Sequence, residues 1–318
     1  METLPRKSSF SSSSKPFRWN LFFDSENRVR LMWRILIFLS IFIALQIFFG
    51  SIGYSLAGSF NRADIRTVIF INGLFSLAAA LMASWITGRY CEHLAISSLG
   101  FAVDSRTLRY VGLGFLYGSL VFCLTVGLAI PFSSLSYVLN SEWNVPSALS
   151  SMLLAALFLS APAAFEEVLF RGYLFQTLVR ARKTILGVVL TSALFATLHS
   201  MNPNVTEIAI LNTFLAGVWF ATAYLISKNL WFPIAIHFAW NWTQVVIFGA
   251  ELSGFGSFVS TPFLKEIDKG PAWITGGDYG NEGGLACTAA MLAAISVNSF
   301  LLVRAVRRRS RSSKPSES

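Results

Sequence analysis

The sequence contains few charged residues, few cysteines and few histidines. Charged residues make up 13% of its 318 residues, whereas a soluble domain carries about 25%. The three cysteines, Cys91, Cys123 and Cys287, are scattered and form no CxxC pair, so they indicate neither a disulfide framework nor a cysteine zinc site. The low charge points to lipid, rather than water, as the solvent for most of the chain.

Long uncharged runs take up most of the sequence. About 20 apolar residues in a helix cross a hydrocarbon core of about 30 Å, and backbone groups in lipid must be hydrogen-bonded within the segment. We therefore predict an all-α fold, a polytopic membrane bundle of about eight transmembrane helices. The runs are Ile35–Asn61, Thr67–Gly88, Tyr110–Ser141, Trp143–Phe165, Thr184–Thr206, Ile208–Ser227, Asn229–Ala250 and Gly283–Val303.

Positive charges are unevenly distributed around these runs. Of the 25 Lys and Arg residues, only Arg62, Arg66, Lys265 and Lys269 fall in segments that eight spans place opposite the termini. Lys and Arg concentrate on the cytoplasmic side of membrane proteins. We predict a multi-pass integral membrane protein with both termini in the cytoplasm, in the plasma or inner membrane if the source is bacterial. The net charge of +9 is then a topology signal, and we expect no nucleic-acid partner.

The chain divides into two tails and one membrane domain. Residues 1–30 are polar and Ser-rich and are predicted to be a disordered cytoplasmic tail. They lack the cleavage site of a signal peptide, so we expect the first span to be retained. Residues 31–303 are predicted to form one transmembrane helical domain, with its motifs within 150–245, and residues 304–318 a basic cytoplasmic tail.

Glycines predict two local features. Gly114 and Gly118 form a GxxxG pattern, which is typical of close helix packing. The outer segment between Glu251 and Gly283 contains GPAWITGGDYGNEGG, whose glycines favour turns over a helix.

Ionisable residues inside membrane spans are rare, and they often mark functional sites. The pair Glu166-Glu167 lies in a helical pattern of about thirty residues that continues to Arg180. Glu167 and Arg171 are four apart and can form an ion pair, whereas Glu166 points about 100° away and is free for chemistry. The alternative is an ordinary helix end with a surface ion pair.

His199 is predicted to lie at the depth of Glu166. Both residues are about sixteen positions from the basic turn at Arg180–Lys183, hence roughly 24 Å from it in a helical hairpin. A single buried His is otherwise a packing residue. On the seventh run, His237 and Asn241 are four apart and project from one face, where the alternative is hydrogen bonding between helices.

These side chains together suggest hydrolysis. A carboxylate beside a His can activate water as a general base, and His237 with Asn241 can stabilise the oxyanion of a tetrahedral intermediate. Alternatively, Glu166, His199 and His237 could hold a zinc ion, although the HExxH pattern of many zinc proteases is absent.

The three motifs also resemble those of a known family. They read EEVLFR from Glu166 to Arg171, FATLH from Phe195 to His199, and HFAWN from His237 to Asn241. In this order they are similar to the EExxxR, FxxxH and HxxxN motifs of the CPBP family, which comprises type II CAAX prenyl endopeptidases and bacteriocin-processing or immunity proteins.

The resemblance implies an intramembrane endopeptidase of the metallo- or glutamate type. Glu166 and His199 would activate water, His237 and Asn241 would form the oxyanion site, and Glu167 with Arg171 would support them. We expect membrane lipids and a peptide or protein substrate as partners, with a C-terminal CAAX-like segment as one substrate class. Zinc dependence, prenylation of the substrate and oligomeric state stay open, as do a non-catalytic immunity or scaffold protein and a transporter.

Overall fold

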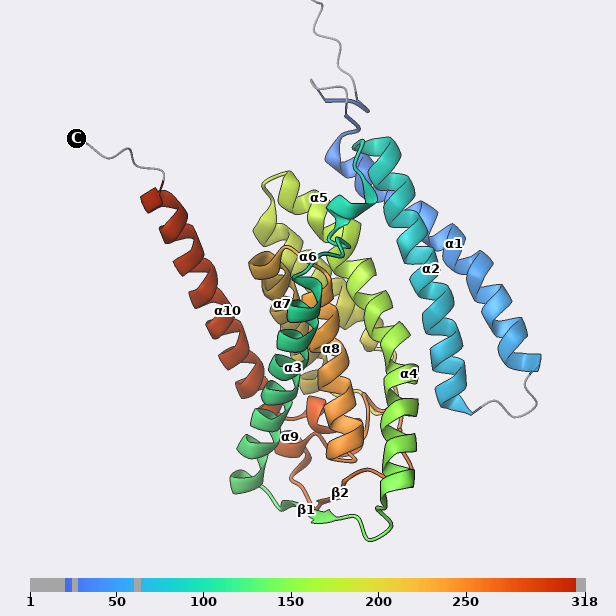
Figure 1. Ribbon diagram of the computed structural model, residues 1–318, viewed down its shortest axis with the longest axis vertical. Coiled ribbons are helices and arrows are strands. Elements are labelled where there is room, and N and C mark those ends of the chain that lie inside the picture. Colours follow the sequence, from blue (N-terminus) through green and yellow to red (C-terminus); the bar gives the residue numbers. More distant parts are fainter. Residues whose placement is uncertain (1–20, 25–27, 60–63, 313–318) are drawn as a thin grey trace, which may run out of the picture.

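The computed structural model describes residues 21–24, 28–59 and 64–312, and this part of the chain forms a bundle of helices (Figure 1). Each predicted run contains a helix. Within these described residues, six helices are long and apolar enough to cross a membrane, which confirms the polytopic helical bundle. These six cover Leu31–Leu56, Ile65–Cys91, Thr107–Phe132, Val145–Arg180, Glu207–Ser227 and Leu285–Arg308.

In the described residues, the elements follow the order of the runs, with two short strands and the two short helices α5 and α9 between them. The helices are α1 (Leu31–Ser59), α2 (Ile65–Cys91), α3 (Thr107–Ala129), α4 (Val145–Leu169), α5 (Phe175–Arg180), α6 (Thr184–His199), α7 (Glu207–Ser227), α8 (Trp231–Trp242), α9 (Ala272–Thr275) and α10 (Leu285–Ser312). The strands are β1 (Leu135–Leu139) and β2 (Leu264–Asp268).

Several boundaries differ from the runs. The third run reaches Ser141, but its helical part ends at Phe132 and β1 follows. Helices α6 and α8 contain only 16 and 12 residues. Absence of charge does not mark where such helices end, because a turn can also be apolar. Asn61 lies outside the described residues.

The two predicted tails are described only in part. Of residues 1–30, the structure describes 21–24 and 28–30, where Phe23 and Val29 form one antiparallel bridge. In the C-terminal segment, α10 continues as far as Ser312. The start of α1 and the end of α10 lie at the same end of the bundle (Figure 1).

Helices α4 and α5 form one long helix that continues to Arg180, as the sequence predicted, but the helix is kinked, which was not predicted. They are joined by a π-helical turn, Phe170–Leu174, in which Gly172 has non-helical backbone angles. Single π-helical turns inside α-helices often occur at functional sites. Here the turn carries Arg171, one helical turn after Glu167.

The GxxxG pattern packs α3 directly against α8. A Cβ atom at Gly114 would lie 2.7 Å from the Phe232 carbonyl oxygen, and one at Gly118 would lie 2.3 Å from that of Ile236. Only glycine permits so close an approach of the two backbones. The predicted helix contact is therefore confirmed, and it fixes the position of the helix that carries His237.

Residues 248–284, here called the covering segment, fold back over one end of the bundle. Within it, β2 pairs with β1 in an antiparallel register that joins Leu135 to Asp268. The rest consists of loops, α9 and two short 3₁₀ turns, Gly277–Tyr279 and Asn281–Gly283. The glycine-rich part therefore forms turns and single helical turns, in agreement with the sequence.

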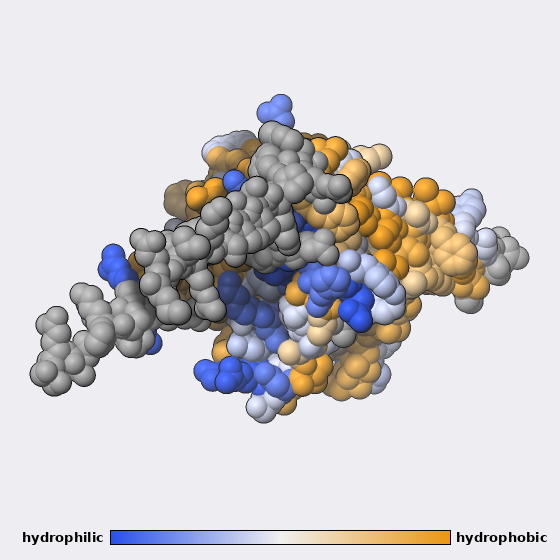
Figure 2. All heavy atoms as spheres, turned by 90° about the horizontal axis from the view of Figure 1, so that it is seen from above, coloured by the Kyte–Doolittle hydropathy of each residue, from blue (hydrophilic) through white to orange (hydrophobic). Residues whose placement is uncertain are grey.

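The outer surface is suited to lipid. Large hydrophobic side chains are exposed along α1, α3, α4 and α10, among them Ile47, Leu120, Leu153 and Phe300. Seen from above, hydrophobic residues cover the flanks, and hydrophilic residues gather on the end of the bundle (Figure 2). The chain is an integral membrane protein.

Candidate active site

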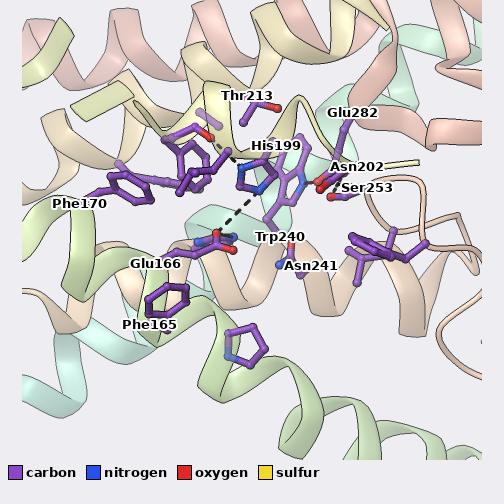
Figure 3. Close-up of a pocket in the computed structure, with 18 of the residues that line it drawn as sticks. Phe165, Glu166, Phe170, His199, Asn202, Thr213, Trp240, Asn241, Ser253 and Glu282 are labelled. Carbon is purple, nitrogen blue, oxygen red and sulfur yellow. Dashed lines mark hydrogen bonds and ion pairs between the residues drawn. The ribbon is translucent and has the colours of Figure 1, made fainter. Parts of the chain in front are cut away.

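Glu166 and His199 face each other across a helical hairpin. The hairpin turns between Arg180, the end of α5, and Thr184, the start of α6. Glu166 Oε2 lies 3.9 Å from His199 Nε2, and both side chains are partly buried (Figure 3). The predicted meeting of these two residues at one depth is confirmed.

The ring of His199 is held by its own helix. Its Nδ1 lies 2.9 Å from the carbonyl oxygen of Phe195, one turn earlier on α6. Because a carbonyl oxygen can only accept, Nδ1 carries the proton. In the neutral ring, Nε2 therefore presents its lone pair towards Glu166.

Glu167 and Arg171 form a fully buried ion pair. Arg171 Nη1 lies 2.9 Å from Glu167 Oε1, and neither side chain is exposed to solvent. Arg171 also donates a hydrogen bond to the Gly217 carbonyl oxygen on α7, and its guanidinium lies over the rings of Phe195 and Phe220. The predicted pair is confirmed. The topology prediction assigned Arg171, with the other Lys and Arg residues outside the four named, to the cytoplasmic side, but its side chain lies in the protein interior.

His237 lies between the two glutamates. Its Nδ1 is 3.1 Å from Glu167 Oε1, and its Nε2 is 3.7 Å from Glu166 Oε2. The ring stacks on Phe220, with centroids 4.8 Å apart and an interplanar angle of 19°. The contact with Glu167 was not predicted, because the register between α4 and α8 is set by packing rather than by spacing along the chain.

Asn241 follows His237 by one turn of α8 and lines the same cavity. The sequence Asn241-Trp242-Thr243 fits a glycosylation acceptor, but it lies inside the bundle. The two motif residues of α8 thus share one face, as their spacing predicted, and both line the cavity beside Glu166.

The cavity has a volume of about 390 Å³ and is bounded by α2, α4, α6, α7, α8, α10 and the covering segment. Glu166, His199, His237 and Asn241 line it, whereas Glu167 and Arg171 do not. The two adjacent glutamates therefore have different surroundings: one opens to the cavity, and the other is held in the protein interior.

Sequence reasoning missed several polar residues of the cavity. They come from α2, α7 and the segments outside the helices, and they are Asn72, Ser76, Asn202, Asn212, Thr213, Ser253 and Glu282. The only sequence signal for Glu282 was a carboxylate within the glycine-rich outer segment. Its place at the site depends on how that segment folds back.

The site contains side chains that zinc favours. Nδ1 of each imidazole is held by a hydrogen bond, and Nε2 of each points towards Glu166, an arrangement typical of histidines that ligate zinc. Nevertheless, within the described residues no three His, Cys, Asp or Glu side chains are spaced to hold a metal ion.

Residues 143–243 match the family model of the type II CAAX prenyl endopeptidase Rce1-like proteins. The segment contains all three motifs and confirms the family resemblance drawn from them. At the level of the family, it indicates an intramembrane CAAX-type endopeptidase with a membrane-associated peptide substrate. No curated protein matches the chain. Glu282 lies beyond the matched segment.

Proposed function

We propose that this protein hydrolyses a peptide bond of a membrane-associated substrate, using water activated by Glu166 and His199. The observation that carries the proposal is the distance of 3.9 Å between Glu166 Oε2 and His199 Nε2 in a cavity enclosed by membrane helices. This separation is too long for a direct hydrogen bond, and one water molecule can bridge it.

The protonation of His199 determines how such a water is oriented. With its proton on Nδ1, His199 accepts one hydrogen bond from the water through Nε2, and Glu166 accepts the other. The water lone pair then faces the substrate carbonyl carbon. As the oxygen–carbon bond forms, Glu166 takes the water proton and later gives it to the departing amine when the carbon–nitrogen bond breaks.

His237 and Asn241 are placed to stabilise the oxyanion. The amide of Asn241 supplies N–H donors. His237 donates from Nδ1 to Glu167, so its Nε2 can donate to an oxyanion only when the ring is doubly protonated. Glu167, fixed by Arg171, thus orients the ring of His237 and balances its charge.

A zinc-dependent version of the same protease is the second candidate. The anchored Nδ1 atoms of His199 and His237 favour it, because they leave both Nε2 atoms free to ligate. The zinc ligands would be Glu166, His199 and His237, whose side chains would have to move closer together than they are in the structure. A zinc ion bound there would polarise the substrate carbonyl and acidify the attacking water.

The decisive experiment compares the wild-type protein with Glu166→Gln. The substitution keeps size and hydrogen bonding but removes the base, so turnover should fall by roughly 10²- to 10⁴-fold. Purified protein in detergent is incubated with a library of C-terminal peptides, and products are identified by mass spectrometry. Glu207→Gln, at the exposed start of α7, is the matched control and should cleave like wild type.

Two outcomes would contradict the proposal. Equal cleavage by Glu166→Gln and wild type would remove Glu166 from the reaction. Absence of cleavage by wild-type protein, together with biological activity retained in Glu166→Gln, would instead indicate an immunity or scaffold protein, or a transporter.

A further inference from the structure

Glu282 brings a second carboxylate to the cavity. It belongs to the 3₁₀ turn Asn281–Gly283 of the covering segment, and it lines the same cavity as Glu166. Glu282 lies with Asn202 and Ser253 on one side of His199, while Glu166 lies on the other (Figure 3). It is therefore placed to meet a side chain that flanks the attacked bond, rather than the bond itself.

Three hydrogen bonds fix Glu282. Its Oε1 accepts from Trp240 Nε1 at 3.0 Å, and its Oε2 accepts from the Ser253 hydroxyl at 2.6 Å. Its backbone oxygen accepts from the Asn212 amide on α7 at 2.7 Å. The carboxylate is thus oriented before any substrate arrives, and a preorganised group loses little conformational entropy on binding.

The backbone around Glu282 is equally constrained. Gly280 has φ +91°, and a Cβ atom there would lie 2.2 Å from the Glu251 carbonyl oxygen. Only glycine is tolerated at such a position. The turn therefore holds Glu282 at the cavity wall.

Among the described residues, no Lys or Arg is paired with the carboxylate of Glu282. It takes part in none of the ion pairs formed in residues 21–24, 28–59 and 64–312. The described residues that line the cavity include Glu166 and Glu282 but neither Lys nor Arg. Glu282 is partly buried, and burying a carboxylate without a paired cation costs free energy. A neutral side chain could accept the hydrogen bonds from Trp240 and Ser253 at a lower cost in desolvation free energy. These two hydrogen bonds therefore do not explain why the side chain at this position is charged.

We propose that Glu282 determines specificity by binding a basic side chain of the substrate near the scissile bond. A carboxylate offers about four lone-pair positions, and two of those on Glu282 are occupied. The others can accept from a Lys ammonium or an Arg guanidinium, whose positive charge balances that of Glu282. The inference rests on the proposed endopeptidase function and adds a substrate class to it: peptides that carry Lys or Arg in the segment that enters the cavity.

The test uses matched fluorogenic peptides in which each position flanking the cleaved bond is in turn Lys, norleucine or Glu. Norleucine keeps most of the aliphatic length of Lys but lacks its charge. For purified full-length wild-type protein, kcat/KM should be roughly 10- to 100-fold higher for the Lys peptide at one position, the range expected for a hydrogen bond to a charged group. The Glu peptide should be the poorest.

Substitution of Glu282 then shows whether this residue recognises the Lys side chain of the substrate or only holds the covering segment in place. Glu282→Gln should bring the Lys and norleucine peptides to similar kcat/KM, mainly through a higher KM for the Lys peptide, while Glu207→Gln keeps the preference. If Glu282→Gln slows all peptides equally, Glu282 only positions the covering segment, and the inference is wrong. No Lys preference in wild type overturns it without any variant. Cleavage of no peptide at all refutes the proposed function itself.

Discussion

The imidazole of His237 donates a hydrogen bond from Nδ1 to Oε1 of Glu167 across 3.1 Å, within a site where Glu167 is fully buried. The bond joins α8 to α4 and sets which nitrogen faces the cavity. Glu167 is held in turn by its ion pair with Arg171. The orientation of His237 therefore depends on the linked, buried side chains of Glu167 and Arg171.

His237→Ala should lower kcat by roughly 10²- to 10³-fold with little change in KM, as removal of one oxyanion donor does. The reason is that Nε2 faces the cavity beside Glu166 and Asn241. Steady-state kinetics on any peptide that the wild-type protein cleaves will measure the effect. His93 is the remaining histidine of the sequence and does not line the cavity, so His93→Ala should behave like wild type. A rise in KM alone would assign His237 to substrate binding.

Metal content distinguishes the two versions of the mechanism. If Glu166 and His199 activate water without metal, active purified protein should hold far less than one equivalent of zinc, and a chelator should leave its rate unchanged. Elemental analysis and chelation followed by zinc addition make this measurement. About one equivalent of zinc that is lost in His237→Ala, with reversible loss of turnover on chelation, would establish the zinc-dependent version.

Gly118→Ala should reduce activity through the position of α8. The new Cβ would lie 2.3 Å from the Ile236 carbonyl oxygen, so α3 and α8 must separate. A displacement of about 1 Å at a site can cost roughly 10²-fold in rate. Gly127→Ala, on the same helix with nothing within 4 Å of its Cβ, is the matched control. Equal rates for the two variants would show that the close contact does not position His237.

Glu92 should make stability depend on pH in the acidic range. It follows α2 and pairs with Arg34 and Arg180 at 2.7 and 2.8 Å. Burial raises the pKa of Glu92, but the hydrogen bond and charge of Arg180 and the charge of Arg34 outweigh burial, so the pKa lies below its ordinary 4.5. The stabilisation is therefore complete above about pH 4.5 and is lost as pH falls through the lower, folded-state pKa.

Thermal unfolding of wild type and Glu92→Gln across pH 7 to 3 tests this linkage. The difference in melting temperature should be largest at pH 7 and should shrink as pH falls below about 4.5. A difference that stays constant over this range would mean that the carboxylate charge of Glu92 does not stabilise the fold.

Both termini are predicted to be cytoplasmic. Reporter fusions after Glu142 and within residues 265–282 should then read as external, because Lys and Arg are concentrated at the other end of the spans. A fusion within residues 181–183 should read as cytoplasmic. The opposite pattern would mean that the protein is inserted in the opposite orientation, with the helical bundle itself unchanged.

Local spacing in the sequence was enough to predict the relations within single helices and across one tight hairpin. Glu167 and Arg171 pair because residues four apart share a helix face, and Glu166 meets His199 because equal numbers of helical residues separate them from one turn. Gly114 and Gly118 predicted a close helix contact for a similar reason, although not that α8 is the partner.

The tertiary structure decided the relations between segments with no fixed distance along the chain. The bond from His237 to Glu167 depends on the register of α8 against α4, which side-chain packing and the α3 glycines set. Glu282 reaches the cavity only because β2 pairs with β1, Gly280 permits a tight turn and Asn212 holds the turn in place. Helical periodicity gives no information about such contacts, since the first depends on how two helices pack against each other and the second on how an irregular segment folds back over the bundle.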